Sequence, residues 1–257
     1  MPIYMNNEAR SDENAIAMTA VEREARVELA ECYRIFHRLG WTELIFNHIT
    51  LRVPGPERVF LINPFGLRYD EITPDNLVAV DIDGLPVRSG QAAINRAGFV
   101  THSAIHRHVE GAHCVMHTHT TTGCAVSCLE DGLSHDSFYG AQLFDRVAYH
   151  DFEGVTVNLE EQARMVQSIG NRKAVVLRNH GLLSLGSDVA EAFMWLWLLQ
   201  RACDIQIAAA SAGRVRTLST HVRCQTAGES AGLEPKLTQL VYAALRREVG
   251  NGPTQAT

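Results

Sequence analysis

The sequence alternates short apolar runs with longer amphipathic segments, and this alternation is what most constrains its fold. Strand-length apolar runs lie at residues 49–53, 59–62, 77–82, 112–119, 147–149, 154–157 and 173–177. Apolar residues at helical spacing predict helices at residues 20–40, 97–109, 124–129, 160–169, 189–212 and 233–249. Asp83-Gly84 is a hairpin signal after one of the early strands. The pattern predicts an α/β fold in which helices cover both faces of a mixed sheet.

The size of the chain favours one large domain. It has 257 residues, of which 46% are hydrophobic, enough for a single sizeable core. We expect this domain to span residues 20–250, preceded by a flexible arm at residues 1–19 and followed by a flexible tail at residues 251–257.

Charge and hydropathy exclude several classes of partner. The formal net charge is −6 and the basic residues are scattered, which argues against nucleic acid. The longest apolar stretch lies between Glu191 and Arg201, too short for a membrane span. The polar N-terminal segment does not resemble a signal peptide, and the six cysteines form no C-x-x-C pair. We therefore expect a cytoplasmic protein with reduced, structural thiols and a small-molecule substrate.

Two histidines at the end of a predicted strand are the main functional signal. His117 and His119 are two residues apart, so their side chains point to the same face and can bind one metal ion. His180 follows another buried strand, but spacing alone does not distinguish it from an ordinary hydrogen-bonded histidine. The histidines at 102, 106 and 108 lie on a predicted helix, which suggests surface or supporting positions. Those at 37, 48, 135, 150 and 221 are interpreted as structural or solvated.

Several motifs together resemble those of the class II aldolase and adducin family. They are CVMHTH at 114–119, LRNHG at 177–181, FNHIT at 46–50, INPFG at 62–66 and GFVTHSAIH at 98–106, the last nearest to the adducin branch. The resemblance covers roughly residues 20–212. It implies a three-layer α/β/α sandwich with a mixed, largely antiparallel sheet, and a homotetramer with sites near subunit interfaces.

The resemblance also implies a metal site and a substrate pocket. His117, His119 and His180 would hold a divalent metal, zinc or else manganese, with one position open for substrate. Asn47, Asn63 and Gly66 stand in the loops that bind the substrate's anionic group in this family.

The sequence departs from the aldolase pattern at three places. Gly98 replaces the acid–base carboxylate. Arg96 and Ala97 replace the two serines that bind phosphate, and Phe65 replaces the threonine of the other phosphate loop. Arg96 could bind a carboxylate with its two-pronged guanidinium, although a solvated arginine is the simpler interpretation.

Two further residues are weaker candidates for a catalytic role. His102 could act as a supporting base or make a structural hydrogen bond. Tyr139 could donate a proton into the site of a neighbouring subunit or simply pack as an ordinary tyrosine.

Two functions fit these observations. The first is a metal-dependent, aldolase-like lyase acting on a small oxygenated carbonyl or carboxylate compound other than a standard sugar phosphate. The second is a non-catalytic interaction module like the adducin head, which also has the paired histidines. Adducins continue into a neck and a basic tail, whereas this sequence ends at Thr257. We favour the enzyme, because open three-histidine metal sites are more often catalytic than structural.

Overall fold

A computed structural model describes residues 4–5, 17–55, 58–154, 160–230 and 235–250. Its centre is a seven-stranded sheet with the order β4-β3-β2-β6-β9-β8-β7. Neighbouring strands are antiparallel except β7 and β8, which are parallel. In that order the strands are Val78–Val80, Phe60–Ile62, Ile49–Arg52, Cys114–Thr118, Gly181–Gly186, Ala174–Leu177 and Val147–His150. The prediction of a mixed, largely antiparallel sheet is confirmed.

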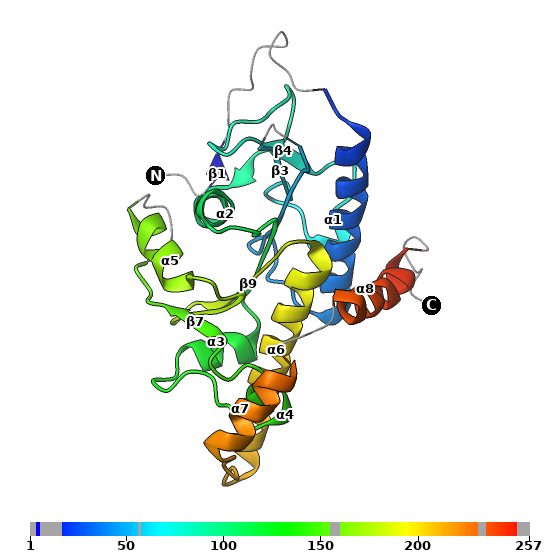
Figure 1. The fold of residues 1–257 in the computed structure, drawn as a ribbon. Coiled ribbons are helices and arrows are strands. Elements are labelled where there is room, and N and C mark those ends of the chain that lie inside the picture. Colours follow the sequence, from blue (N-terminus) through cyan, green and yellow to red (C-terminus); the bar gives the residue numbers. More distant parts are fainter. Residues whose placement is uncertain (1–3, 6–16, 56–57, 155–159, 231–234, 251–257) are drawn as a thin grey trace.

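Helices cover both faces of the sheet and complete the three layers. On one face lie α1 (Ala20–Leu39), α6 (Val189–Ala212) and α8 (Pro235–Val249), and on the other α2 (Arg96–His108) and α5 (Glu161–Ile169) (Figure 1). Alternate strand residues divide between two cores. Met116 and Val176 pack under α1 and α6, whereas Val115 and Val175 pack under α2 and α5. This alternation also determines the face on which the side chain of His117 emerges.

The helices predicted at residues 20–40 and 189–212 match the observed α1 and α6 closely, because their end signals are strong. At the start of α1 the Thr19 side chain accepts a hydrogen bond from the Glu22 amide, and Gly40 ends the helix in the left-handed conformation. At the start of α6 the Asp188 carboxylate accepts from the Glu191 amide, as the capping-box spacing predicts.

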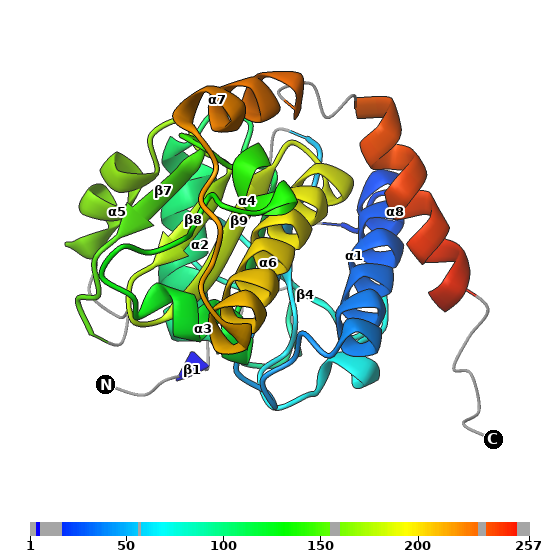
Figure 2. The same ribbon diagram turned by 90° about the horizontal axis from the view of Figure 1, so that it is seen from below.

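Other elements were not predicted from the sequence. They are β1 (Tyr4–Met5), β5 (Ile94–Asn95), β9, η2 (Tyr69–Glu71), α4 (Phe138–Gln142) and α7 (Thr220–Glu229). Helix α7, which packs on α4 (Figure 2), buries only Ala227, so it has no apolar stripe to detect. Strand β1 lies within the predicted arm and pairs with β5. Of the strand expected at 154–157, Gly154 lies in a bend and the rest is outside the described residues, as are positions 251–257.

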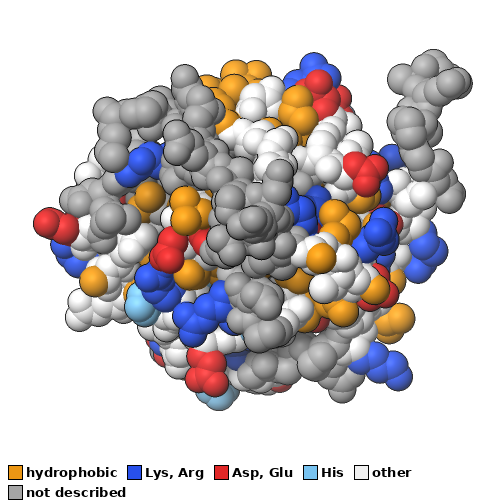
Figure 3. All heavy atoms as spheres, turned by 90° about the horizontal axis from the view of Figure 1, so that it is seen from above, with side chains coloured by type: hydrophobic (Ala, Val, Ile, Leu, Met, Phe, Trp, Pro, Cys, Tyr) orange, Lys and Arg blue, Asp and Glu red, His pale blue; other side chains and the backbone are white. Residues whose placement is uncertain are grey.

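One face of the molecule shows no separation of charged and apolar side chains. On the face shown in Figure 3, basic, acidic and apolar side chains are interspersed. No helix among the described residues is both long enough and apolar enough to cross a bilayer.

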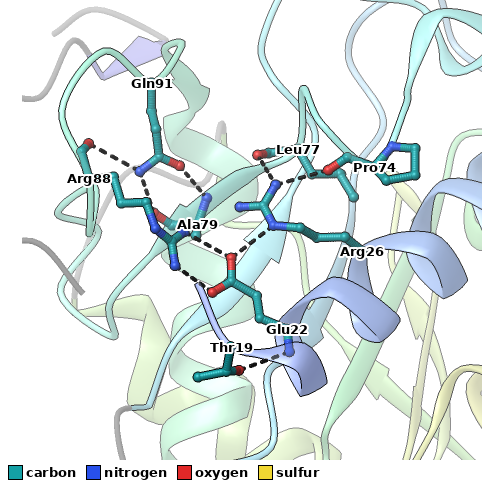
Figure 4. Close-up of polar contacts among 8 residues, drawn as sticks. All are labelled: Thr19, Glu22, Arg26, Pro74, Leu77, Ala79, Arg88 and Gln91. Atoms are coloured by element: carbon teal, nitrogen blue, oxygen red, sulfur yellow. Dashed lines mark hydrogen bonds and ion pairs between the residues drawn. The ribbon is translucent and has the colours of Figure 1, made fainter. Parts of the chain in front are cut away.

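A buried ionic cluster fastens α1 to the edge of the sheet (Figure 4). The Glu22 carboxylate, only 3% exposed, accepts hydrogen bonds from Arg26 at 2.8 Å and from both terminal nitrogens of Arg88. Arg26 also donates to the carbonyl groups of Pro74 and Leu77, just before β4. Burial alone would raise the pKa of Glu22, but the hydrogen bonds and charges of the two arginines together lower it below its ordinary value.

We predict that Glu22→Gln destabilises the protein by about 3–5 kcal/mol, because it leaves buried arginine charge without its carboxylate. Urea unfolding at neutral pH measures the effect, with Glu24→Gln on the exposed side of α1 as the control. Because the pKa of Glu22 is lowered in the folded state, its contribution is present at neutral pH and is lost as the pH falls through that pKa. The difference between wild type and variant should therefore shrink in acid. Equal stability of the two variants at pH 7 would contradict the prediction.

Candidate metal centre

Three histidines converge where β6 and β9 pair. His117 is in β6, His119 follows the strand, and His180 lies in the turn between β8 and β9. The antiparallel register sets Thr118 opposite Leu182, which brings that turn beside the end of β6. The ligand atoms of all three imidazoles lie within 4.8 Å of one another. The structure thus brings together the three residues expected to hold a metal.

The backbone prepares His117 as a ligand. Its Nδ1 lies 2.8 Å from the carbonyl oxygen of Leu182, so Nδ1 carries the proton and Nε2 presents a lone pair. That Nε2 atom lies 2.7 Å from Nε2 of His119. Gly181 allows the close approach, because a Cβ atom there would stand 2.4 Å from the carbonyl oxygen of Thr118. The three residues fit a divalent metal.

The three imidazoles are neutral at physiological pH. Burial lowers the pKa of each: well below the ordinary value for His117, and to about 4 for His180. The neighbouring histidines lower the pKa of His117 and His180 further, while the charge of Glu43 partly opposes the effect of burial on His119. Neutral imidazole is the form that binds a metal, so these groups need not lose protons first.

The histidines open into a cavity with a volume of about 620 Å³. Its other walls come from the turn before β2, the start of α2 and the segment around Phe152. The apolar part is formed by Phe46, Ala97, Phe152 and Leu177, and the polar part by Glu43, His48, Asn95, Thr101 and Asn179. None of the described residues that line it is a lysine or an arginine.

His48 occupies the space of the missing carboxylate. A Cβ atom built on Gly98 would stand 2.5 Å from the ring of His48. That ring is 6% exposed, lines the cavity and has its centre 5.5 Å from that of His117. Interpreting His48 as structural or solvated from sequence was therefore incomplete. The FNHIT motif contained the signal, but only the fold places it against Gly98.

Behind His48 lies a buried hydrogen-bonded chain. The Thr50 hydroxyl lies 2.8 Å from Nδ1 of His102 and 2.7 Å from Nε2 of His106, whose Nδ1 donates to the Ala112 carbonyl at 2.7 Å. Because His106 donates through Nδ1, its Nε2 atom accepts a hydrogen bond from the Thr50 hydroxyl. The Thr50 oxygen in turn accepts from Nδ1 of His102, which leaves Nε2 of His102 unprotonated. That atom is buried and has no hydrogen-bond partner among the described residues. His102 itself does not line the cavity; its ring packs 4.4 Å from that of His48, so it is placed to support rather than to contact a substrate.

The other predicted site residues also lie outside the cavity wall. Asn63 Oδ1 is 2.9 Å from the buried Tyr33 hydroxyl, and the amide of Asn47 is buried with no partner among the described residues. Gly66 lies in an exposed turn with a φ of 99°. Arg96 is the first residue of α2, and it is its neighbours Asn95 and Ala97 that face the cavity. Tyr139 packs against Trp197, so any role of this tyrosine would be in a neighbouring subunit.

Comparison with known proteins agrees with this geometry. Residues 27–207 match the model of the class II aldolase and adducin N-terminal domain. The chain belongs to the class II aldolase and adducin family. An aldolase II superfamily protein from Pseudomonas syringae is 44% identical, with a TM-score of 0.84 over 90% of this chain and 94% of that one.

Both branches of the family are represented among the relatives. An L-fuculose 1-phosphate aldolase from Glaciozyma antarctica is 25% identical, with a TM-score of 0.77 over 92% of this chain and 96% of that one. Mouse alpha-adducin is 39% identical over 254 residues, which is 93% of this chain but 34% of the adducin. The family therefore includes a named enzyme and a much longer protein, and family membership alone does not decide between them.

The contact of Gly98 with His48 gives a sharp test of this site. We predict that Gly98→Ala destabilises the wild type by about 1–3 kcal/mol through overpacking. In a His48→Ala background the same change should stabilise by roughly 0.5–1 kcal/mol, because alanine is the better helix former. Chemical denaturation of the four proteins measures the coupling.

Gly228→Ala in α7 is the matched control, because a Cβ atom there would meet nothing within 4 Å. It should have the same effect in both backgrounds. An equal effect of Gly98→Ala in both backgrounds would show that His48 does not occupy this space.

Proposed function

We propose that this protein is a metal-dependent lyase of the class II aldolase type, acting on a small oxygenated carbonyl or carboxylate compound. The observation that carries the proposal is the open arrangement of three neutral imidazoles at the base of a 620 Å³ cavity. A divalent metal, zinc in our proposal, would supply a Lewis acid that stabilises the negative charge developing on a carbonyl oxygen as the neighbouring carbon–carbon bond breaks.

The residues around the metal position restrict the substrate. Phe46, Phe152 and Leu177 form the apolar part of the cavity wall, while Asn95, Thr101 and Asn179 can hydrogen-bond to hydroxyl groups. Because no lysine or arginine is among the described lining residues, an anionic group would find its positive partner at the metal. The substrate in our proposal therefore presents its carbonyl or carboxylate oxygen to the histidines and a neutral remainder to the walls.

The alternative is a non-catalytic module like the adducin head, favoured by the 39% identity to mouse alpha-adducin over 93% of this chain. Metal binding alone does not separate the two functions, since either could retain the histidines. Metal-dependent turnover of a substrate would distinguish the enzyme from the interaction module. A protein that binds metal tightly yet turns over no compound of a broad carbonyl and hydroxy-acid panel would support the alternative.

We predict one divalent metal ion per chain, lost on substitution of a ligand. His119→Ala should weaken zinc affinity by more than about a hundredfold, since loss of even a supporting partner costs ten- to a hundredfold. Elemental analysis after dialysis against a weak chelator measures occupancy. His221→Ala, an exposed histidine on α7, is the control. Full occupancy in His119→Ala would refute the assignment.

We predict that phosphorylated sugars are poor substrates. A phosphate dianion needs several donors, and here Phe65 and Ala97 stand where the family has hydroxyl groups. The shortfall costs several kcal/mol, on the order of a thousandfold in affinity. The test compares turnover of fuculose 1-phosphate and ribulose 5-phosphate with that of their unphosphorylated analogues and a panel of hydroxy-acids. Preferential cleavage of the phosphorylated sugars would contradict this view of the pocket.

A further inference from the structure

One acidic side chain enters the cavity from a part of the chain that the sequence motifs did not single out. Glu43 lies in the turn between α1 and β2 and lines the cavity together with the three histidines. We infer that Glu43 binds the metal ion as its fourth protein ligand when no substrate is bound, and so supplies the carboxylate that position 98 lacks. This inference rests on the metal site of the proposed function.

The turn that carries Glu43 is anchored on both sides. Trp41 packs on Phe36 and Phe193, and its amide donates to the Phe36 carbonyl at 2.9 Å. On the other side the amide of Ile49 donates to the buried Tyr33 hydroxyl at 2.9 Å. Within the turn, the amide of Phe46 donates to the Glu43 carbonyl at 2.8 Å. These contacts hold the backbone of Glu43 at the cavity wall.

The charge balance of the cavity favours a carboxylate at the metal. Three neutral imidazoles leave a divalent ion with its full positive charge in a largely apolar enclosure, where an unneutralised charge is costly. Glu43 is the one carboxylate among the described residues that line the cavity. Its negative charge opposes the effect of burial on the pKa of His119, which places it on the His119 side.

The side chain of Glu43 is not committed elsewhere. No hydrogen bond or ion pair of its carboxylate is found within the described part of the chain. The carboxylate lies outside the set of ligand atoms that are within 4.8 Å of one another, so ligation requires rotation of the side chain. A glutamate has three side-chain torsions with which to make that rotation.

A carboxylate side chain could not be accommodated at position 98 of α2, where the aldolase pattern has one. The ring of His48 occupies the space beside Gly98, so a side chain there would collide with it. A ligand carried by the turn before β2 avoids this collision, because Glu43 enters the cavity from a different segment than α2.

The test is metal affinity and the visible spectrum of the cobalt-loaded protein, measured for the wild type, Glu43→Gln and Glu110→Gln. Glu110 is exposed and precedes β6 at the end away from His117, so its substitution makes the same change in net charge without reaching the cavity. We expect Glu43→Gln to weaken zinc affinity between about tenfold and a hundredfold and to change the cobalt spectrum, with Glu110→Gln like the wild type. The metal-free melting temperature should be unchanged in both variants.

The outcomes separate this inference from the proposed function. If the wild type binds no metal, the proposed function fails and the inference with it. If the wild type binds metal and Glu43→Gln has the same affinity and cobalt spectrum, only the inference is overturned. A weakened affinity with an unchanged cobalt spectrum would also overturn it, because Glu43 would then act through its charge and not as a ligand.

Discussion

The pairing of β6 with β9 is the constraint on which the rest of this site depends. The register sets His117 opposite Leu183 and Thr118 opposite Leu182, and the Leu182 carbonyl also fixes the proton on His117. Side chains alternate along a strand, so a slip of one residue would turn His117 into the core under α6. Gly181 makes the register possible, because any Cβ atom there would collide with the backbone of Thr118. One strand pair therefore determines the position, the face and the tautomer of the candidate ligand.

The packing of α2 against the sheet then determines the chemistry of the cavity. Gly98 brings the helix against His48, and the imidazole takes the space that a carboxylate fills in the aldolase pattern. A negatively charged group is thus exchanged for a neutral, buried one. This exchange leaves the α2 wall of the cavity without a carboxylate. The one carboxylate among the described lining residues comes from another segment, the turn that contains Glu43.

The buried Glu22 cluster is separate from the cavity. The Glu22 cluster, with its two arginines, holds the start of α1 against the edge of the sheet near β4. The histidines of the site and those behind it, His102 and His106, are instead held neutral by burial, which lowers the pKa of each. Stability and metal binding should therefore respond to different substitutions, since the arginine cluster and the histidines share no direct contact among those described.

The sequence by itself determined the elements with strong local signals and the residues of the candidate metal centre. The capped helix at 189–212, the paired histidines after an apolar strand and the family motifs were sufficient, because caps and periodicity act over a few residues. Strand β9 and helix α7 were missed, the first because glycines bound it and the second because it buries a single residue. Only the tertiary structure decided that His48 faces the cavity, that His102 lies behind it and that Glu43 enters from another turn. These facts depend on contacts between segments distant in sequence, which no local pattern of residues contains.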